Sequence, residues 1–159
     1  MTKRKFANDL GVIVLLFALL CLLAWSLPAK AADAAIGDSI ALGTGNALHI
    51  ETYARQNMGS CWIEVQTPLK NFDHVVISAG INDPPGSCLQ GIRQKVKAGS
   101  VTWIVPAAIN PAYKHVLNIA SEYGDKVVFY TCLGGCSKIN FHPGSYAEVA
   151  HNVKRSWGE

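Results

Sequence analysis

The sequence predicts an α/β domain in which a parallel sheet is covered by helices on both faces. Short runs rich in Val and Ile, typical of buried strands, alternate with segments whose apolar residues recur three and four positions apart. Of the 159 residues, 50% are apolar and 16% are charged, which gives the chain enough apolar side chains for a core and excludes the disordered class. In such folds the functional loops follow the carboxyl ends of the strands.

The start of the chain has the layout of a secretory signal peptide. A basic Lys-Arg-Lys at residues 3–5 precedes an uncharged apolar stretch over 11–25, and Ala-Lys-Ala at 29–31 is a small-x-small cleavage signal. We expect cleavage after Ala31, which leaves one domain over residues 32–159 in a secreted or periplasmic location. An uncleaved membrane anchor is the alternative, but the apolar stretch is short for a spanning helix, which needs roughly 20 residues.

Without this leader the domain carries no net charge. Of the 14 basic residues four lie before residue 32, and of the 11 acidic residues one does, which leaves ten of each. Nucleic-acid binding needs a basic surface, so no nucleic-acid partner is expected. No membrane partner is expected after cleavage, and the oligomeric state is left open.

Five cysteines are present, and one of them lies in the leader. The other four are Cys61, Cys88, Cys132 and Cys136. An even number in an exported domain predicts two disulfides, for which three pairings exist. Cys132 and Cys136 are close enough in sequence for a local loop, which leaves Cys61 to pair with Cys88. A metal site with added histidine ligands is the alternative, but the C-x3-C spacing is looser than that of a zinc knuckle.

In the first half of the domain the expected elements follow from apolar runs and glycines. Residues 34–36 predict a strand that ends at a glycine turn, and the Gly-Thr-Gly at 43–45 predicts a loop with a helix after it. Alternating side chains over 62–65 predict a second strand. The β-branched run within 73–79 predicts a buried third strand, followed by a loop over 80–86 that contains two prolines.

In the second half, helices alternate with two more strands. Ser87 can cap a helix whose apolar residues are spaced three and four apart, and residues 101–105 predict a strand that a proline stops. Pro111 opens another amphipathic helix. A further strand is expected at 127–130, and a single apolar stripe predicts an amphipathic helix over 146–157.

Polar residues with catalytic chemistry fall on the loops at strand ends. Ser39 directly follows the first strand, and a serine becomes a nucleophile when a base takes its proton. His142, on the loop before the last helix, is the best base among the five histidines; the others, His74 included, receive no role. Acyl transfer also needs donors for the developing oxyanion, which the Asn82 side chain and the backbone N–H groups of Gly59 and Ser39 can supply. No metal or cofactor is needed.

Four segments in order along the domain carry a wider motif pattern. Residues 35–43 read Ala-Ile-Gly-Asp-Ser-Ile-Ala-Leu-Gly, and residues 77–83 end in Gly-Ile-Asn-Asp. Residues 53–59 form a diffuse block ending in glycine, and 141–146 read Phe-His-Pro-Gly-Ser-Tyr. Together they resemble the blocks of the SGNH (GDSL-type) hydrolases, esterases and lipases with a flavodoxin-like, three-layer α/β/α fold. The resemblance implies that the four residues which name the family are Ser39, Gly59, Asn82 and His142.

Two features depart from the family. Its last block is D-x-x-H, but the position three before His142 is Ile139, and the nearest polar neighbour is Asn140. In a serine-histidine-aspartate triad, replacing the acid by its amide lowers turnover by about 10⁴, although a backbone carbonyl could orient the imidazole instead. The domain is also small for the family. We therefore expect an exported serine esterase acting on small esters or acylated glycans, or alternatively a catalytically degenerate SGNH-like binding protein of the cell envelope.

Overall fold

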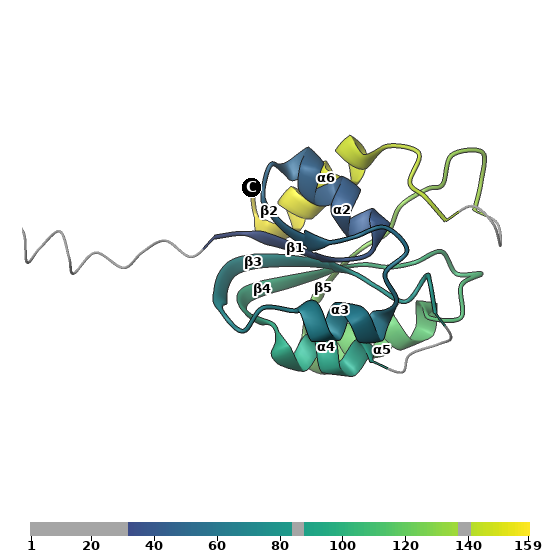
Figure 1. Cartoon of the computed structure of the whole chain (residues 1–159). Helices are drawn as coiled ribbons and strands as arrows, with labels where there is room; N and C mark the ends of the chain where they lie inside the picture. The colour runs from purple at the N-terminus through teal and green to yellow at the C-terminus, as the bar shows by residue number, and fades with distance from the viewer. Residues whose placement is uncertain (1–31, 84–87, 137–140) are drawn as a thin grey trace, which may run out of the picture. The chain divides into compact units, whose positions relative to one another are not determined.

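The computed structural model describes residues 32–83, 88–136 and 141–159, whose arrangement is shown in Figure 1. Five parallel strands form one sheet in the order β2-β1-β3-β4-β5. The strands are β1 (Ala34–Gly37), β2 (Glu51–Ala54), β3 (Asn71–Ser78), β4 (Lys97–Ile104) and β5 (Lys126–Val128). The helices are α2 (Ser39–Leu48), α3 (Ser60–Gln66), α4 (Leu89–Lys95), α5 (Tyr113–Tyr123) and α6 (Tyr146–Trp157). Helices α2 and α6 cover one face and α3, α4 and α5 the other, which confirms the expected three-layer, flavodoxin-like fold.

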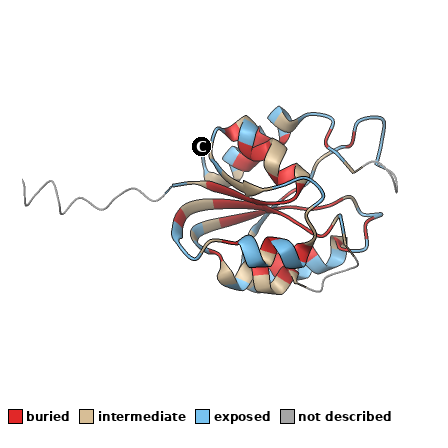
Figure 2. Ribbon diagram, viewed as in Figure 1, coloured by how far each residue is buried: buried red, intermediate tan, exposed pale blue. Residues whose placement is uncertain are grey.

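The core consists of two apolar layers, one on each face of the sheet. Ile36 and Val75 face the layer that holds α3, α4 and α5. Their sequence neighbours Ala35 and Val76 face the layer that holds α2 and α6. Figure 2 shows the central strands buried along most of their length. Both faces are covered at β1 and at the carboxyl-terminal halves of β3 and β4, which are fully buried and mostly apolar, and this made the three strands predictable.

The loop expected at residues 43–45 and the helix expected after it are wrong, because these residues lie inside α2 and the next element is strand β2. Asp38 caps this helix, since its Oδ1 accepts hydrogen bonds from the amides of Ile40 and Ala41. The two glycines serve close packing. A Cβ atom on Gly45, for example, would lie 2.7 Å from the Cβ of Ala35 on β1.

The strand expected at 62–65 is also wrong, because this segment belongs to helix α3. Ile63 is buried there, while Trp62 and Val65 are 67% and 65% exposed, so the alternation reflected exposed apolar side chains rather than a pleated strand. Strand β2 was missed altogether. It lies at the edge of the sheet, pairs only with β1 and has no fully buried residue, so it lacks a strong apolar pattern.

The remaining elements agree with the sequence within a few residues. Helix α4 begins at Leu89, and the expected cap at Ser87 lies outside the described residues. Strand β4 starts four residues earlier than expected, and β5 is shorter. Helix α6 has the expected bounds.

Two disulfides are present, with Cα–Cα distances of 4.9 Å in each: Cys61–Cys88 and Cys132–Cys136. They confirm the expected pairing, and the alternative of a metal site built from these cysteines is wrong. Paired cysteines fit an oxidising compartment. The leader and its cleavage site at Ala31 lie outside the described residues. Within residues 32–159, as far as they are described, no helix has the length and apolar character needed to cross a membrane.

Candidate active site

Ser39 stands at the carboxyl end of β1, where the backbone leaves the sheet through a tight turn. Gly37 has φ of 144°, and a Cβ atom there would lie 1.8 Å from the carbonyl oxygen of Ser78 on β3. Glycine is therefore required at this position. The next amide, that of Asp38, donates to the same carbonyl at 3.0 Å. Ser39 follows as the first residue of α2 and is half-buried, and its hydroxyl has no hydrogen-bond partner among the described residues.

Asp38 is fully buried beneath this turn. Its Oδ1 caps α2, with the amide of Ile40 at 3.0 Å, while its Oδ2 is buried without a hydrogen-bond partner in the described part of the chain. Burial raises the pKa of the Asp38 carboxyl to about 7, although the Ser78 side chain, and after it the Ile40 and Ala41 amides, act in the opposite direction. Near neutral pH the carboxyl next to Ser39 is therefore partly protonated and partly charged.

His142 contacts a tyrosine four residues further along the chain. Its Nδ1 lies 2.8 Å from the hydroxyl of Tyr146, the first residue of α6. The Tyr146 ring lies against Gly43 of α2, because a Cβ atom there would fall 2.4 to 2.6 Å from three ring atoms. Gly43 is four residues after Ser39 and so lies on the same face of the helix. Tyr146 therefore connects His142 with the helix that begins at Ser39, although no described hydrogen bond joins Ser39 and His142.

The Tyr146 phenol, which contacts His142, is half-buried. Burial raises the pKa of this phenol, and the negative charge of Asp38 raises it further. Burial likewise raises the pKa of Tyr130, with the Asp38 charge as the next cause. Both phenols therefore stay protonated at neutral pH. Since Tyr146 is neutral, its oxygen can accept the hydrogen of His142 Nδ1 while its own hydrogen remains available to an acceptor.

The segment that carries His142 is fixed on both sides of that residue. Tyr130 donates its hydroxyl hydrogen to the carbonyl of Phe141 at 2.6 Å, and the amide of Gly144 donates to the carbonyl of Thr131 at 2.9 Å. Ile139 and Asn140, where the family's acid was expected to be missing, lie outside the described residues. Among the described contacts, the partner of the His142 ring is the Tyr146 hydroxyl, not a carboxylate.

Gly59 and Asn82 lie on the loops that follow β2 and β3, the two strands that flank β1. The Asn82 side-chain amide donates to the carbonyl of Met58 at 3.1 Å, directly before Gly59. The Asp83 carboxylate accepts the Ser60 amide at 2.7 Å and also accepts the Ser60 hydroxyl. These contacts join the loops after β2 and β3. One hydrogen of the Asn82 amide is used on the Met58 carbonyl, which leaves the other for a ligand.

The four expected site residues thus form two pairs. Ser39 and His142 are linked through α2 and Tyr146, and Gly59 and Asn82 through the Met58 carbonyl. The loop after β2 is tied to the end of β1 because the Arg55 amide donates to the Gly37 carbonyl at 3.1 Å. No described hydrogen bond connects one pair directly with the other.

Two contributors were missed from the sequence. Tyr146 begins the helix that was predicted from its apolar stripe and received no role in the site, yet its hydroxyl contacts His142. Helical spacing gives no signal for this contact, because His142 lies on the loop before α6. Asp83 was treated only as part of a motif, and its bond to Ser60 fixes the loop that presents Gly59. Nothing local in the sequence indicates that contact, which joins residues 23 positions apart.

A groove of about 570 Å³ lies between the loop after β2 and helix α3. It is lined by Arg55, Gln56, Asn57, Met58, Trp62 and Gln66. Concave surfaces next to positioned polar groups are the usual places for small ligands, so this groove is where part of a substrate could lie.

Comparisons with known proteins identified no relative of this chain. No family model matches the chain, and neither curated proteins nor solved structures include a match. The likeness to the SGNH hydrolases therefore depends on the four motif segments.

Proposed function

We propose that this protein is an exported serine esterase of the SGNH type, acting on small esters or on O-acyl groups of glycans. The observation that carries the proposal is the linkage of the two reactive groups through α2. Ser39 begins this helix with a hydroxyl that has no hydrogen-bond partner in the described part of the chain, and Tyr146, packed against Gly43 of the same helix, contacts the His142 ring. The leader and the two disulfides fit export.

In the proposed reaction His142 is the general base. Its Nδ1–H donates to the Tyr146 oxygen, which leaves Nε2 without a hydrogen and able to take the Ser39 proton. The Ser39 oxygen attacks the ester carbonyl, and the imidazolium returns the proton to the departing alcohol. A water molecule then attacks the acyl-enzyme by the same route, which releases the acid and restores Ser39.

The oxyanion of each tetrahedral intermediate would be held by three donors. They are the Gly59 N–H, the free hydrogen of the Asn82 amide and the Ser39 N–H at the start of α2. The amino end of the 10-residue helix α2 adds partial positive charge where the oxyanion develops. A neutral phenol stabilises an imidazolium less than a carboxylate does, so we expect lower turnover than in an enzyme with a complete triad.

The test compares hydrolysis of p-nitrophenyl acetate by the wild type and Ser39→Ala. Ser121→Ala is the matched control, because Ser121 is an exposed serine on α5, on the opposite face of the sheet. We expect Ser39→Ala to lose nearly all activity and the control to keep it. A fluorophosphonate probe should add one covalent label on Ser39. Equal rates for wild type and Ser39→Ala would show that the protein is not a serine esterase of this kind.

One observation favours a second candidate, a catalytically degenerate SGNH-like binding protein. The described partner of His142 is a neutral phenol, and His142 is exposed. For that candidate, fluorophosphonate would not label Ser39, while an acylated oligosaccharide would bind wild type and Ser39→Ala equally well.

A further inference from the structure

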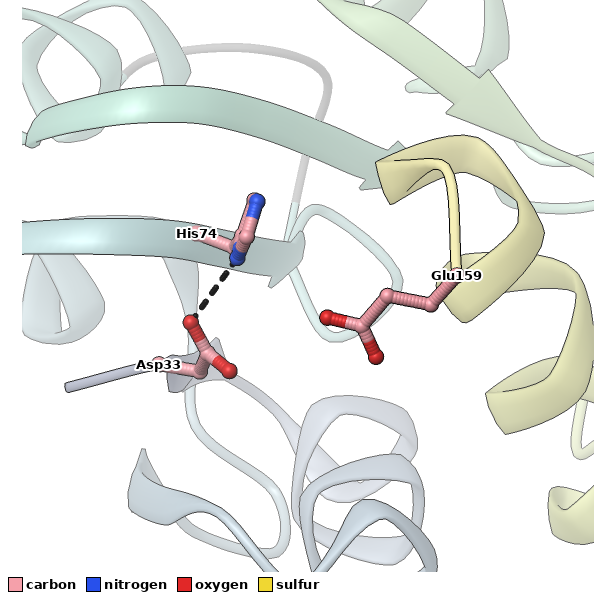
Figure 3. A group of neighbouring side chains, drawn as sticks. All are labelled: Asp33, His74 and Glu159. Carbon is pink, nitrogen blue, oxygen red and sulfur yellow. Dashed lines mark hydrogen bonds and ion pairs between the residues drawn. The ribbon is translucent and has the colours of Figure 1, made fainter.

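A second group of chemically reactive side chains lies at the amino end of the sheet. Asp33 directly precedes β1, His74 lies on the adjacent strand β3, and Glu159 follows helix α6. Figure 3 shows the three side chains turned toward one another. Ser39 follows the other end of β1, about 13 Å away for a strand of four residues. The group is therefore separate from the candidate active site.

The donor atoms of these residues are close together. Nδ1 of His74 lies 2.9 Å from Oδ1 of Asp33, and one ligand atom from each of the three residues lies within 4.8 Å of the others. Ligands of one zinc ion, bonded at about 2.0 to 2.2 Å, are themselves about 3.3 Å apart. Asp33 and His74 nearly have that separation already, and Glu159 is an exposed side chain that is able to approach them.

The surrounding structure fixes the imidazole and the backbone of the third ligand. The His74 ring stacks on the Trp157 indole, with centroids 4.8 Å apart and planes 16° apart. The indole N–H in turn donates to the Thr102 hydroxyl at 3.2 Å. The amide of Glu159 donates to the carbonyl of Lys154 at 3.1 Å, which holds this residue at the end of α6. Such outer contacts orient metal ligands in proteins.

Charge also favours a cation at this point. Two carboxylates face one imidazole, so the group has a net charge of about −2 with neutral His74 or −1 with protonated His74. In the described part of the chain, no lysine or arginine forms an ion pair with Asp33 or Glu159. A divalent ion would neutralise the group.

We propose that Asp33, His74 and Glu159 form a binding site for a divalent transition-metal ion of the zinc type. One imidazole and two carboxylates suit Zn²⁺ and its neighbours rather than Mg²⁺ or Ca²⁺, which prefer oxygen ligands alone. Nδ1 of His74 must bind the ion through its lone pair, so its hydrogen would move to Nε2, or leave as a proton if the ring was charged. A bound ion would tie the start of β1 and strand β3 to the end of α6.

The test uses the protein produced from the full-length chain, purified, treated with chelator and titrated with Zn²⁺ alone in a calorimeter. We expect one ion per chain and a rise in melting temperature with added Zn²⁺. His74→Gln should weaken binding by at least about 100-fold and Glu159→Gln by at least about tenfold. Glu159 is exposed, so its variant tests the site without disturbing the fold.

His151→Gln and Glu148→Gln are the matched controls. Both residues are exposed on α6 and lie outside the group. Their affinities for Zn²⁺ should equal that of the wild type. The proposal is overturned if the wild type binds no Zn²⁺ at millimolar concentration, or if Glu159→Gln and His74→Gln bind it as tightly as the controls do.

Discussion

The buried carboxyl of Asp38 should make the stability of the domain depend on pH. Burial raises the pKa of this group from its ordinary value of 3.8 to about 7. The folded state therefore keeps the proton over a range of pH in which the unfolded state releases it. The corresponding stabilisation is fully present below pH 3.8 and is lost as the pH rises through about 7.

The difference of about three pKa units, at 1.36 kcal/mol each, corresponds to about 4 kcal/mol of unfolding free energy. Asp38→Asn removes the titration and keeps an oxygen that can accept the amides of Ile40 and Ala41. We expect the unfolding free energy of the wild type to fall by up to about 4 kcal/mol from low to neutral pH. That of Asp38→Asn should lack this part of the fall.

The assay is urea denaturation of both proteins at a series of pH values from about 4 to about 8.5, with the free energy obtained by linear extrapolation. Asp73→Asn, which removes a half-buried carboxyl on β3, is the control and should fall with pH as the wild type does. Only the change of the unfolding free energy with pH is compared. A constant loss of stability in Asp38→Asn, from an unpaired hydrogen of the introduced amide, therefore does not affect the result. Parallel curves for wild type and Asp38→Asn would refute the reasoning.

Three further changes should be measured by the same denaturation. Gly43→Ala places a Cβ atom 2.4 to 2.6 Å from the Tyr146 ring, so the unfolding free energy should fall by about 1 to 3 kcal/mol and ester hydrolysis should slow. A gain in stability, as at an unhindered helical position, would contradict the clash. Replacing both Cys61 and Cys88 by Ser opens a disulfide between residues 27 positions apart and should lower the unfolding free energy by about 3 to 4 kcal/mol. Opening the Cys132–Cys136 disulfide, with a separation of 4, should lower it by about 2 kcal/mol, and equal losses would contradict this expectation. Asp125→Ala leaves the mostly buried Arg93 guanidinium without its carboxylate partner and should cost about 3 to 5 kcal/mol. A loss below about 1 kcal/mol would mean that the pair is effectively solvated.

The helices and strands that could be predicted are those in which the local apolar pattern shows which residues are buried. Strand β3 and helix α6 are covered in the expected way, so the spacing of their apolar residues identified them. The disulfides followed from the number of cysteines and from one short separation. Gly43 and Gly45 are different, because they allow close contact with Tyr146 and β1, which are distant in sequence. A local pattern cannot distinguish such a glycine from a turn glycine.

The candidate site likewise has features that the sequence could predict and contacts that it could not. The positions of Ser39 and Asn82 at strand ends follow from alternating strands and helices. The contact of Tyr146 with His142 depends on where α6 packs against α2, and that of Asp83 with Ser60 on the pairing of two loops. His74 was set aside as an ordinary strand residue. Its neighbours Asp33 and Trp157 come from opposite ends of the domain, so only the fold brings them to it.

The missing acid changes how negative charge would reach the histidine in the proposed esterase. An aspartate in the last block would place a carboxylate directly on His142. Here the described partner of the His142 ring is the neutral Tyr146 hydroxyl, whose pKa is raised by burial and then by the charge of Asp38. In the proposed esterase a neutral phenol would therefore orient the base, and we expect this base to be weaker than one that contacts a carboxylate.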